Sequence, residues 1–193
     1  MIKVLAYLNI LRFWPHLLCC LLSKNSGKMA EDLKAYKKQY GIEGGKVYPI
    51  LHFLLIHKGF RSLLYYRTGI VSRLFAWLAP GVSNFHVSKT ANVEGGIILF
   101  HSYGTLLDFE SIGSGTWIAH NITCGLKNGK GARIGKNVKI GPGAVFIGGI
   151  TIGDNCTIGP GAVVFKDVPD NCTVVGNPAY ILKQDGVVVK KEL

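Results

Sequence analysis

The sequence lacks the cysteine patterns that crosslink small secreted domains or bind zinc. Its five cysteines form no CxxC motif and no Cys/His spacing typical of a metal site. Three of them, Cys124, Cys156 and Cys172, fall within or next to an apolar repeat, where a free thiol serves as a small filler. We therefore expect no disulfide, no metal and a reducing, cytoplasmic setting.

Acidic residues are scarce. Eleven Asp and Glu stand against 22 Lys and Arg, which gives a formal net charge of +11. A charge of this sign suits nucleic acid, but no nucleic-acid-binding motif accompanies it, so we expect no such partner. A basic surface also suits an anionic cofactor or anionic lipid.

The sequence also lacks a long uninterrupted apolar run. A membrane span needs about 20 such residues, and Lys3, Arg12, Pro15 and His16 interrupt the apolar segment 1–23. No small-residue cleavage site of a signal peptide is visible in it. We prefer a helix that packs on the protein or on a neighbouring subunit. The alternative is an interfacial anchor with peripheral contact at the inner face of a membrane.

The remaining N-terminal sequence also has helical patterns, and we expect residues 1–81 to form an α-helical region. The charged stretch EDLKAYKKQY predicts a short helix that ends near Gly41. VYPILHFLLIH and FRSLLYYRTGIVSRLFAWL predict two more, and Pro80-Gly81 closes the second. Apolar residues recur along that second stretch at helical spacing, at Phe60, Leu63, Leu64, Ile70, Val71, Leu74, Phe75 and Leu78.

A six-residue repeat dominates the stretch from 112 to 165. An aliphatic residue, usually followed by a small one, returns at Ile112, Ile118, Ile134, Ile140, Ile152, Ile158 and Val164. A fixed short period is typical of a stacked solenoid. Six residues suit one short strand and a corner, so three of them close a coil. The six-residue spacing extends into irregular early coils at Phe85, Ala91 and Ile97. The repeat is interrupted after Gly125 by the segment LKNGKGAR, which we expect to form a loop.

These hexads resemble those of the hexapeptide-repeat acyltransferases, which wind into a left-handed parallel β-helix. The preceding FRSLLYYR segment and the closing KDVP and GNPA elements are similar to those of serine acetyltransferases and their relatives in surface-polysaccharide synthesis. The resemblance implies a mainly β domain over residues 82–183, with residues 184–193 as a loosely held tail. It also implies an acetyl-CoA-dependent O-acetyltransferase that works as a homotrimer.

The resemblance places the catalytic base in FHSYGT, at His101, because a histidine can take a hydroxyl proton near neutral pH. His120 lies about one coil later and is the second candidate. The family's other partners are missing: Asn84 or His86 stands at the orienting aspartate, Phe100 at the aspartate before the histidine, and Gly131 at a second histidine. The carboxylates left to orient an imidazole are Glu94, Asp108 and Glu110.

These losses favour a sugar or polysaccharide-precursor hydroxyl as acceptor, with serine as the alternative. The family binds acetyl-CoA along its coils between subunits. Matching motifs puts that cofactor at Gly143, Ala144, Gly161, Ala162, Phe165 and Lys166. Lys127, Lys130, Arg133 and Lys183 are further cations for its phosphates.

Two other classes remain as hypotheses. A metal-bearing β-helix of the γ-carbonic-anhydrase type needs three converging histidines, and only His101 and His120 lie suitably in the coils. A non-catalytic β-helix scaffold needs neither histidine for its role.

Overall fold

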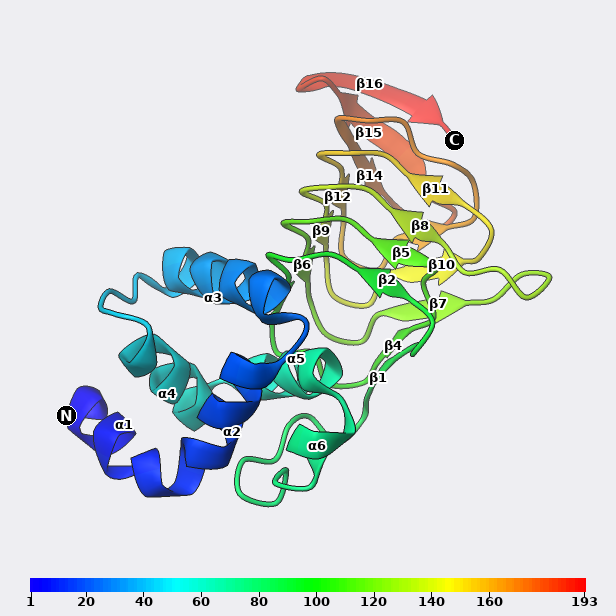
Figure 1. Ribbon diagram of the computed structural model, residues 1–193. Helices are drawn as coiled ribbons and strands as arrows, with labels where there is room; N and C mark the ends of the chain where they lie inside the picture. The colour runs from blue at the N-terminus through cyan, green and yellow to red at the C-terminus, as the bar shows by residue number, and fades with distance from the viewer. The chain divides into compact units, whose positions relative to one another are not determined.

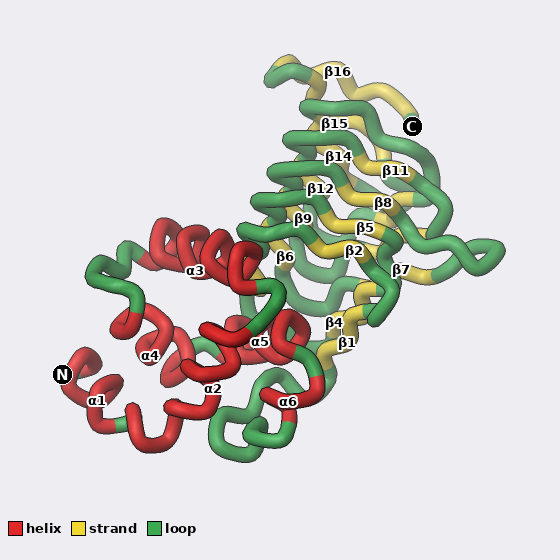
Figure 2. Tube along the Cα trace, viewed as in Figure 1, coloured by secondary structure: helices red, strands yellow, loops and turns green.

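The computed structural model describes all residues, 1–193, and divides into two compact units, Met1–Ser83 and Asn84–Leu193. The first is entirely helical and the second is a stack of short strands (Figures 1 and 2). The division falls two residues after the end of the helical region expected from sequence. Each unit has its own core.

The first unit contains six helices: α1 (Ile2–Leu8), α2 (Ile10–Leu22), α3 (Ser26–Tyr40), α4 (Val47–Ile56), α5 (Lys58–Thr68) and α6 (Ile70–Arg73). Tyr36 lies at the centre of its aromatic core, with ring centroids 5.3 Å from Phe53 and 5.1 Å from Phe60. Arg67 and Asp32 form a buried ion pair beside this core, with Nε 2.9 Å from Oδ2. The helix predicted from the charged stretch is α3, which ends at Gly41 in a left-handed conformation.

The single helix predicted from Phe60 to Leu78 breaks at Gly69. This glycine has a φ of 72° and a ψ of −148°, which no continuing helix allows. Phe60, Leu63 and Leu64 before the break are buried as expected. Ile70, Val71 and Leu74 after it are exposed to solvent. The apolar spacing therefore predicted burial correctly only for the part on α5.

The second unit is a parallel β-helix of three sheets, as the hexads predicted. The first sheet stacks β1 (Phe85–Val87), β4 (Thr105–Leu107), β7 (Thr123–Gly125), β10 (Val145–Ile147) and β13 (Val163–Val164). The second stacks β2 (Asn92–Val93), β5 (Ser111–Ile112), β8 (Arg133–Ile134) and β11 (Thr151–Ile152). The third stacks β3 (Ile98–Leu99), β6 (Trp117–Ile118), β9 (Lys139–Ile140), β12 (Thr157–Ile158) and β14 (Cys172–Val175), followed by β15 (Tyr180–Gln184) and β16 (Val187–Glu192).

The core of the β-helix is the set of predicted inward positions. In the third sheet, Ile118 pairs with Ile140 and Ile140 with Ile158. All three are buried, as are their counterparts in the second sheet. The glycine that follows most of these aliphatic residues is a packing requirement, because a Cβ at Gly113, for example, would lie 2.4 Å from the carbonyl oxygen of Gly135.

Two details differ from the sequence-based expectation. In the first coil, the inward strand residues are Val93 and Leu99, which pair with Ile112 and Ile118. Ala91 and Ile97 are buried too, but they occupy the position before each strand. Residues 184–193 are not a loose tail, because β16 pairs with β15 as an antiparallel hairpin. Its run of three valines favours a strand.

Candidate active site

Both candidate histidines lie at one corner of the β-helix, where the chain passes from the third sheet to the first. Successive coils are joined there by backbone hydrogen bonds. Asn121 N donates to Tyr103 O at 2.9 Å, and Gly143 N donates to His120 O at 3.0 Å. Gly161 N donates in turn to Pro142 O at 2.9 Å. We call this column the histidine corner; it consists of residues 101–104, His120-Asn121, Pro142-Gly143 and Pro160-Gly161.

His101 lies on a two-residue insertion in this corner. Leu106 follows Leu99 by seven residues, whereas their paired partners, Thr123 and Ile118, are five residues apart. Tyr103 is therefore the positional equivalent of His120, and His101-Ser102 is the extra pair. His101 has a φ of 59°, an unusual conformation for a residue other than glycine, and its side chain is exposed. Such backbone strain is concentrated at functional sites.

The side chains of the corner form a ring cluster. The centroids of His101 and His120 are 6.5 Å apart, and Tyr103 stacks on His120 at 4.8 Å with an interplanar angle of 26°. Phe100 contacts His101 edge-on at 4.2 Å and stacks on Trp117 at 5.1 Å. The single-coil spacing of the two histidines thus brings them together, as the sequence predicted.

Two polar atoms in the cluster have no partner within the protein. His120 Nδ1 and Ser102 Oγ are buried and make no hydrogen bond. An unpaired buried polar atom is costly, by about 1–3 kcal/mol, so a polar ligand at this corner offers each a favourable contact. The sequence had not singled out Tyr103 or Ser102, although both stand in the FHSYGT element that identified His101.

None of the three carboxylates proposed to orient an imidazole is bonded to His101. Glu94 Oε1 accepts a hydrogen bond from Asn92 Nδ2 at 3.1 Å. Asp108 Oδ1 lies 3.5 Å from His86 Nε2, and Glu110 Oε2 lies 2.8 Å from Arg133 Nη1. The orientation of the His101 ring therefore comes from its backbone conformation and from the aromatic rings of Phe100 and Tyr103.

The predicted cofactor residues fall into two groups. Gly143 and Gly161 belong to the histidine corner, with φ of 72° and 66°. A Cβ at Gly161 would meet nothing within 4 Å, so this glycine faces open space, whereas a Cβ at Gly143 would lie in ordinary van der Waals contact, 3.8 Å from the Gly161 nitrogen. Ala144 and Ala162 are fully buried in the stack, which leaves only their backbone available to a ligand.

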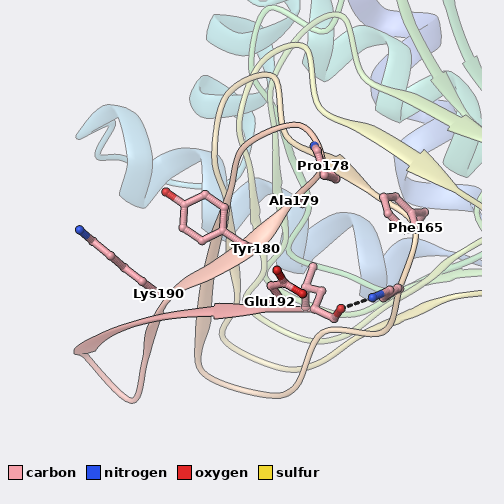
Figure 3. Close-up of a pocket in the computed structure, with 8 residues that line it drawn as sticks. Phe165, Pro178, Ala179, Tyr180, Lys190 and Glu192 are labelled. Carbon is pink, nitrogen blue, oxygen red and sulfur yellow. Dashed lines mark hydrogen bonds between the residues drawn. The ribbon is translucent and has the colours of Figure 1, made fainter.

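Phe165 and Lys166 follow the other end of β13 and line two cavities. One, of about 490 Å³, is bounded by the segment 178–180 and the end of β16, where Lys166 Nζ donates to the Leu193 carbonyl oxygen (Figure 3). The other, of about 530 Å³, lies against the loop after β7, which carries Lys127 and Lys130. That loop is a tight hairpin closed by reciprocal backbone hydrogen bonds of 3.0 Å between those two lysines. Lysine ammonium groups at both cavities suit an anionic ligand.

No three His, Cys, Asp or Glu side chains converge on a common point in the structure. All five cysteines are free thiols, and burial raises the pKa of Cys124 to about 11 and that of Cys156 to about 11. The buried cysteines therefore stay protonated and fill space in the core rather than acting as nucleophiles.

The family model described as "Bacterial transferase hexapeptide (six repeats)" matches residues 131–166. A serine acetyltransferase of Synechococcus elongatus is 33% identical over 157 residues, which cover 77% of this chain and 63% of that protein. A serine acetyltransferase of Staphylococcus aureus strain Mu50 is 29% identical over 174 residues, which cover 85% and 82%. The chain spans less than two thirds of the length of the Synechococcus protein and of a Buchnera aphidicola relative.

Solved structures show the same likeness. The soybean serine acetyltransferase apoenzyme superposes with a TM-score of 0.66 at 29% identity, over 80% of this chain and 67% of that one. The Neisseria gonorrhoeae serine acetyltransferase in complex with serine gives 0.65 at 28%, over 82% and 69%. Residues 131–166 thus match the hexapeptide-repeat transferases, and the chain resembles the serine acetyltransferases.

Proposed function

We propose that this protein is an acetyl-CoA-dependent O-acetyltransferase. The observation that carries the proposal is the histidine corner. The ring centroids of two imidazoles lie 6.5 Å apart there, and the next two coils at the same corner present Gly143 and Gly161, of which Gly161 faces open space. A general base is thereby set beside a surface on which an extended donor can lie. The similarity to serine acetyltransferases supports the same reaction class.

His101 is the proposed general base. A hydroxyl is too weak an acid to ionise at neutral pH, so the ring takes its proton as the oxygen attacks the acetyl carbonyl. Acetyl-CoA supplies the activated thioester, and the proton held on the ring returns to the departing thiolate. Phe100 holds the base by its edge-on contact, and the unpaired Nδ1 of His120 is available to an acceptor or to the developing charge.

L-Serine is the first acceptor to test, because the relatives described above are serine acetyltransferases and one similar structure is a complex with serine. A sugar or polysaccharide-precursor hydroxyl is the second candidate. It is favoured by the loss of the serine-site partners, since Asn84 or His86 stands where the family's aspartate is expected, and Gly131 where its second histidine is expected. His86 is engaged instead with Asp108.

The proposed cofactor site is completed by a second copy of the chain. Gly143 and Gly161 lie at one end of the strands of the first sheet, and the two cavities that share Lys166 lie at the other end. A donor that binds along this sheet between neighbouring subunits implies a homotrimer with a threefold ring of identical contacts. The five free cysteines suit a reducing, cytoplasmic setting.

The test is an acceptor screen with labelled acetyl-CoA against serine, sugars and nucleotide sugars. We expect transfer to one class, and a loss of at least about a hundredfold in kcat for His101→Ala. His57→Ala is the matched control, since its ring packs on Tyr40 in the helical unit. Acetyl-CoA binding without transfer to any hydroxyl would exclude the proposal, and the absence of binding would leave a non-catalytic scaffold.

A further inference from the structure

The outward face of α2 is apolar, where the corresponding face of a helix in a water-soluble unit is normally polar. The side chains that share this face are Leu11, Trp14, Leu18, Leu21 and Leu22. They recur at spacings of three and four residues and therefore lie on one side of the helix. Leu11 is 85% exposed and Leu21 77%, while Phe13 and His16 on the opposite side are buried in the helical core.

A second exposed apolar group adjoins the first. It contains Ile70, Val71, Leu74 and Trp77, and Trp77 is 76% exposed. Helix α6 packs against α2 (Figure 1). Arg12 Nε on α2 also donates to the carbonyl oxygen of Leu78 at 2.5 Å. The two groups therefore lie on neighbouring elements, and we call them together the apolar face: Leu11, Trp14, Leu18, Leu21, Leu22, Ile70, Val71, Leu74 and Trp77.

The charge of the chain is concentrated in the same unit. Residues 1–83 contain 12 Lys and Arg against 3 Asp and Glu, and so carry nine of the chain's eleven net positive charges. Exposed cations adjoin the apolar face: Arg73 lies between Val71 and Leu74, and Lys24 follows Leu22. Cations around an apolar surface with exposed tryptophans are typical of segments that lie in a lipid interface.

We infer that the apolar face docks onto an anionic lipid surface, with α2 lying in the interface. Each basic residue near an anionic leaflet strengthens binding about fivefold. No single helix is long and apolar enough to cross a bilayer; only α1 and α2 taken together pass that test, and they are bent by 77°. A second copy of this chain is a poorer occupant, because the contact would bring two strongly cationic units together.

This inference is tested with the full chain and two kinds of vesicle, phosphatidylcholine alone and phosphatidylcholine with about one third phosphatidylglycerol. We expect co-sedimentation with the anionic vesicles that weakens at high salt. The double variant Leu11→Ser/Leu18→Ser should reduce the partition coefficient at least about tenfold, and Arg73→Gln about fivefold. Val187→Ser/Val188→Ser on β16 is the matched control, since those exposed valines belong to the other unit.

Brominated lipid provides a second measurement that does not depend on the serine variants folding. Trp14 and Trp77 are on the apolar face, and Trp117 is in the β-helix. We expect strong quenching of the wild type and little quenching of Trp14→Phe/Trp77→Phe. The inference is overturned by no binding to anionic vesicles, by equal binding of the Leu11/Leu18 variant, or by a lipid-free oligomer that this variant dissociates.

Discussion

The phenol ring of Tyr103 stacks on the imidazole of His120 across one coil, with ring centroids 4.8 Å apart. The two residues occupy equivalent positions in successive coils, and the insertion that carries His101 lies directly before Tyr103. Tyr103 thus holds the imidazole of His120 by stacking, and it also lies beside His101, the proposed base. It also makes the contribution of each ring separable by mutation.

Removing the Tyr103 ring should lower kcat with whichever acceptor is found. Aromatic pairs contribute about 0.5–1.5 kcal/mol beyond burial, so Tyr103→Ala should reduce the rate roughly two- to twelvefold through the loss of His120 orientation. Tyr103→Phe keeps the stacking and should stay within about twofold. Steady-state kinetics of both variants provide the comparison. Equal losses would assign the effect to the hydroxyl instead of the ring.

A side chain placed on the open Gly161 should interfere with the donor. Gly161 has a φ of 66°, which asparagine tolerates, as Asn121, Asn137 and Asn155 do in this chain at φ of 55–57°. Gly161→Asn should therefore keep its melting temperature and raise KM for acetyl-CoA several-fold. Gly186→Asn, at φ of 81° in the β15–β16 turn with nothing within 4 Å of its Cβ, is the control. An unchanged KM at Gly161 would remove this residue from the donor site.

The buried ion pair of the helical unit should contribute strongly to stability. Arg67 Nε and Nη2 donate to both carboxylate oxygens of Asp32, at 2.9 and 3.2 Å, and both residues are buried. Asp32→Ala leaves the guanidinium without its buried carboxylate and should lower the free energy of unfolding by about 3–5 kcal/mol. Glu110→Ala breaks an exposed pair with Arg133 and should cost less than about 1 kcal/mol. Urea denaturation followed by circular dichroism distinguishes the two.

The helical unit should lose stability in mild acid. His16 Nε2 lies 2.9 Å from Tyr65 Oη, which donates to the Ala79 carbonyl oxygen at 2.6 Å. Burial, with the nearby charges of Arg61 and Arg12, lowers the pKa of His16 below its ordinary value of 6.5. Below pH 6.5, His16 therefore binds a proton more readily in the unfolded chain than in the folded one. The contribution of neutral His16 to the free energy of unfolding is fully present above pH 6.5 and is lost as the pH falls below it.

His16→Gln removes that proton while retaining a donor for Tyr65. Its unfolding free energy should change less between pH 7.5 and pH 5.5 than that of the wild type, when both are measured by urea denaturation. A residual slope is expected from His52, whose pKa burial also lowers. Identical slopes in the two proteins would show that His16 does not titrate on unfolding.

The β-helix was predictable because its repeat encodes one local rule many times. The same inward position recurs at Ile118, Ile140 and Ile158. A wrong assignment of one of them would therefore be recognised from the other two. The first coil has no such support, and its stacking positions, Val93 and Leu99, were misassigned. The helix break was missed because a lone glycine inside an apolar helical pattern is ambiguous until its φ is known.

The candidate site was predictable only in part. The spacing of His101 and His120 implied proximity, and their rings do lie together. The partners of the three carboxylates depend on which strands neighbour one another in the stack. Glu110, for example, pairs with Arg133, which lies one coil later in the stack. That coil contains the LKNGKGAR insertion, and the six-residue repeat does not predict the length of an insertion. The stacking of Tyr103 on His120 likewise depends on the two-residue offset in the first coil.

The antiparallel hairpin of β15 and β16 changes how the third sheet ends. A further parallel coil in that place would expose unpaired backbone N–H and C=O groups, to which every earlier coil hydrogen-bonds its successor. Another molecule could pair with such an edge, and fibres could grow from it. Here the chain folds back, and the outermost strand carries Lys190 and Lys191. Mutual repulsion between these charges on approaching molecules opposes end-to-end polymerisation, so a protein assembled by simple repetition keeps a finite length.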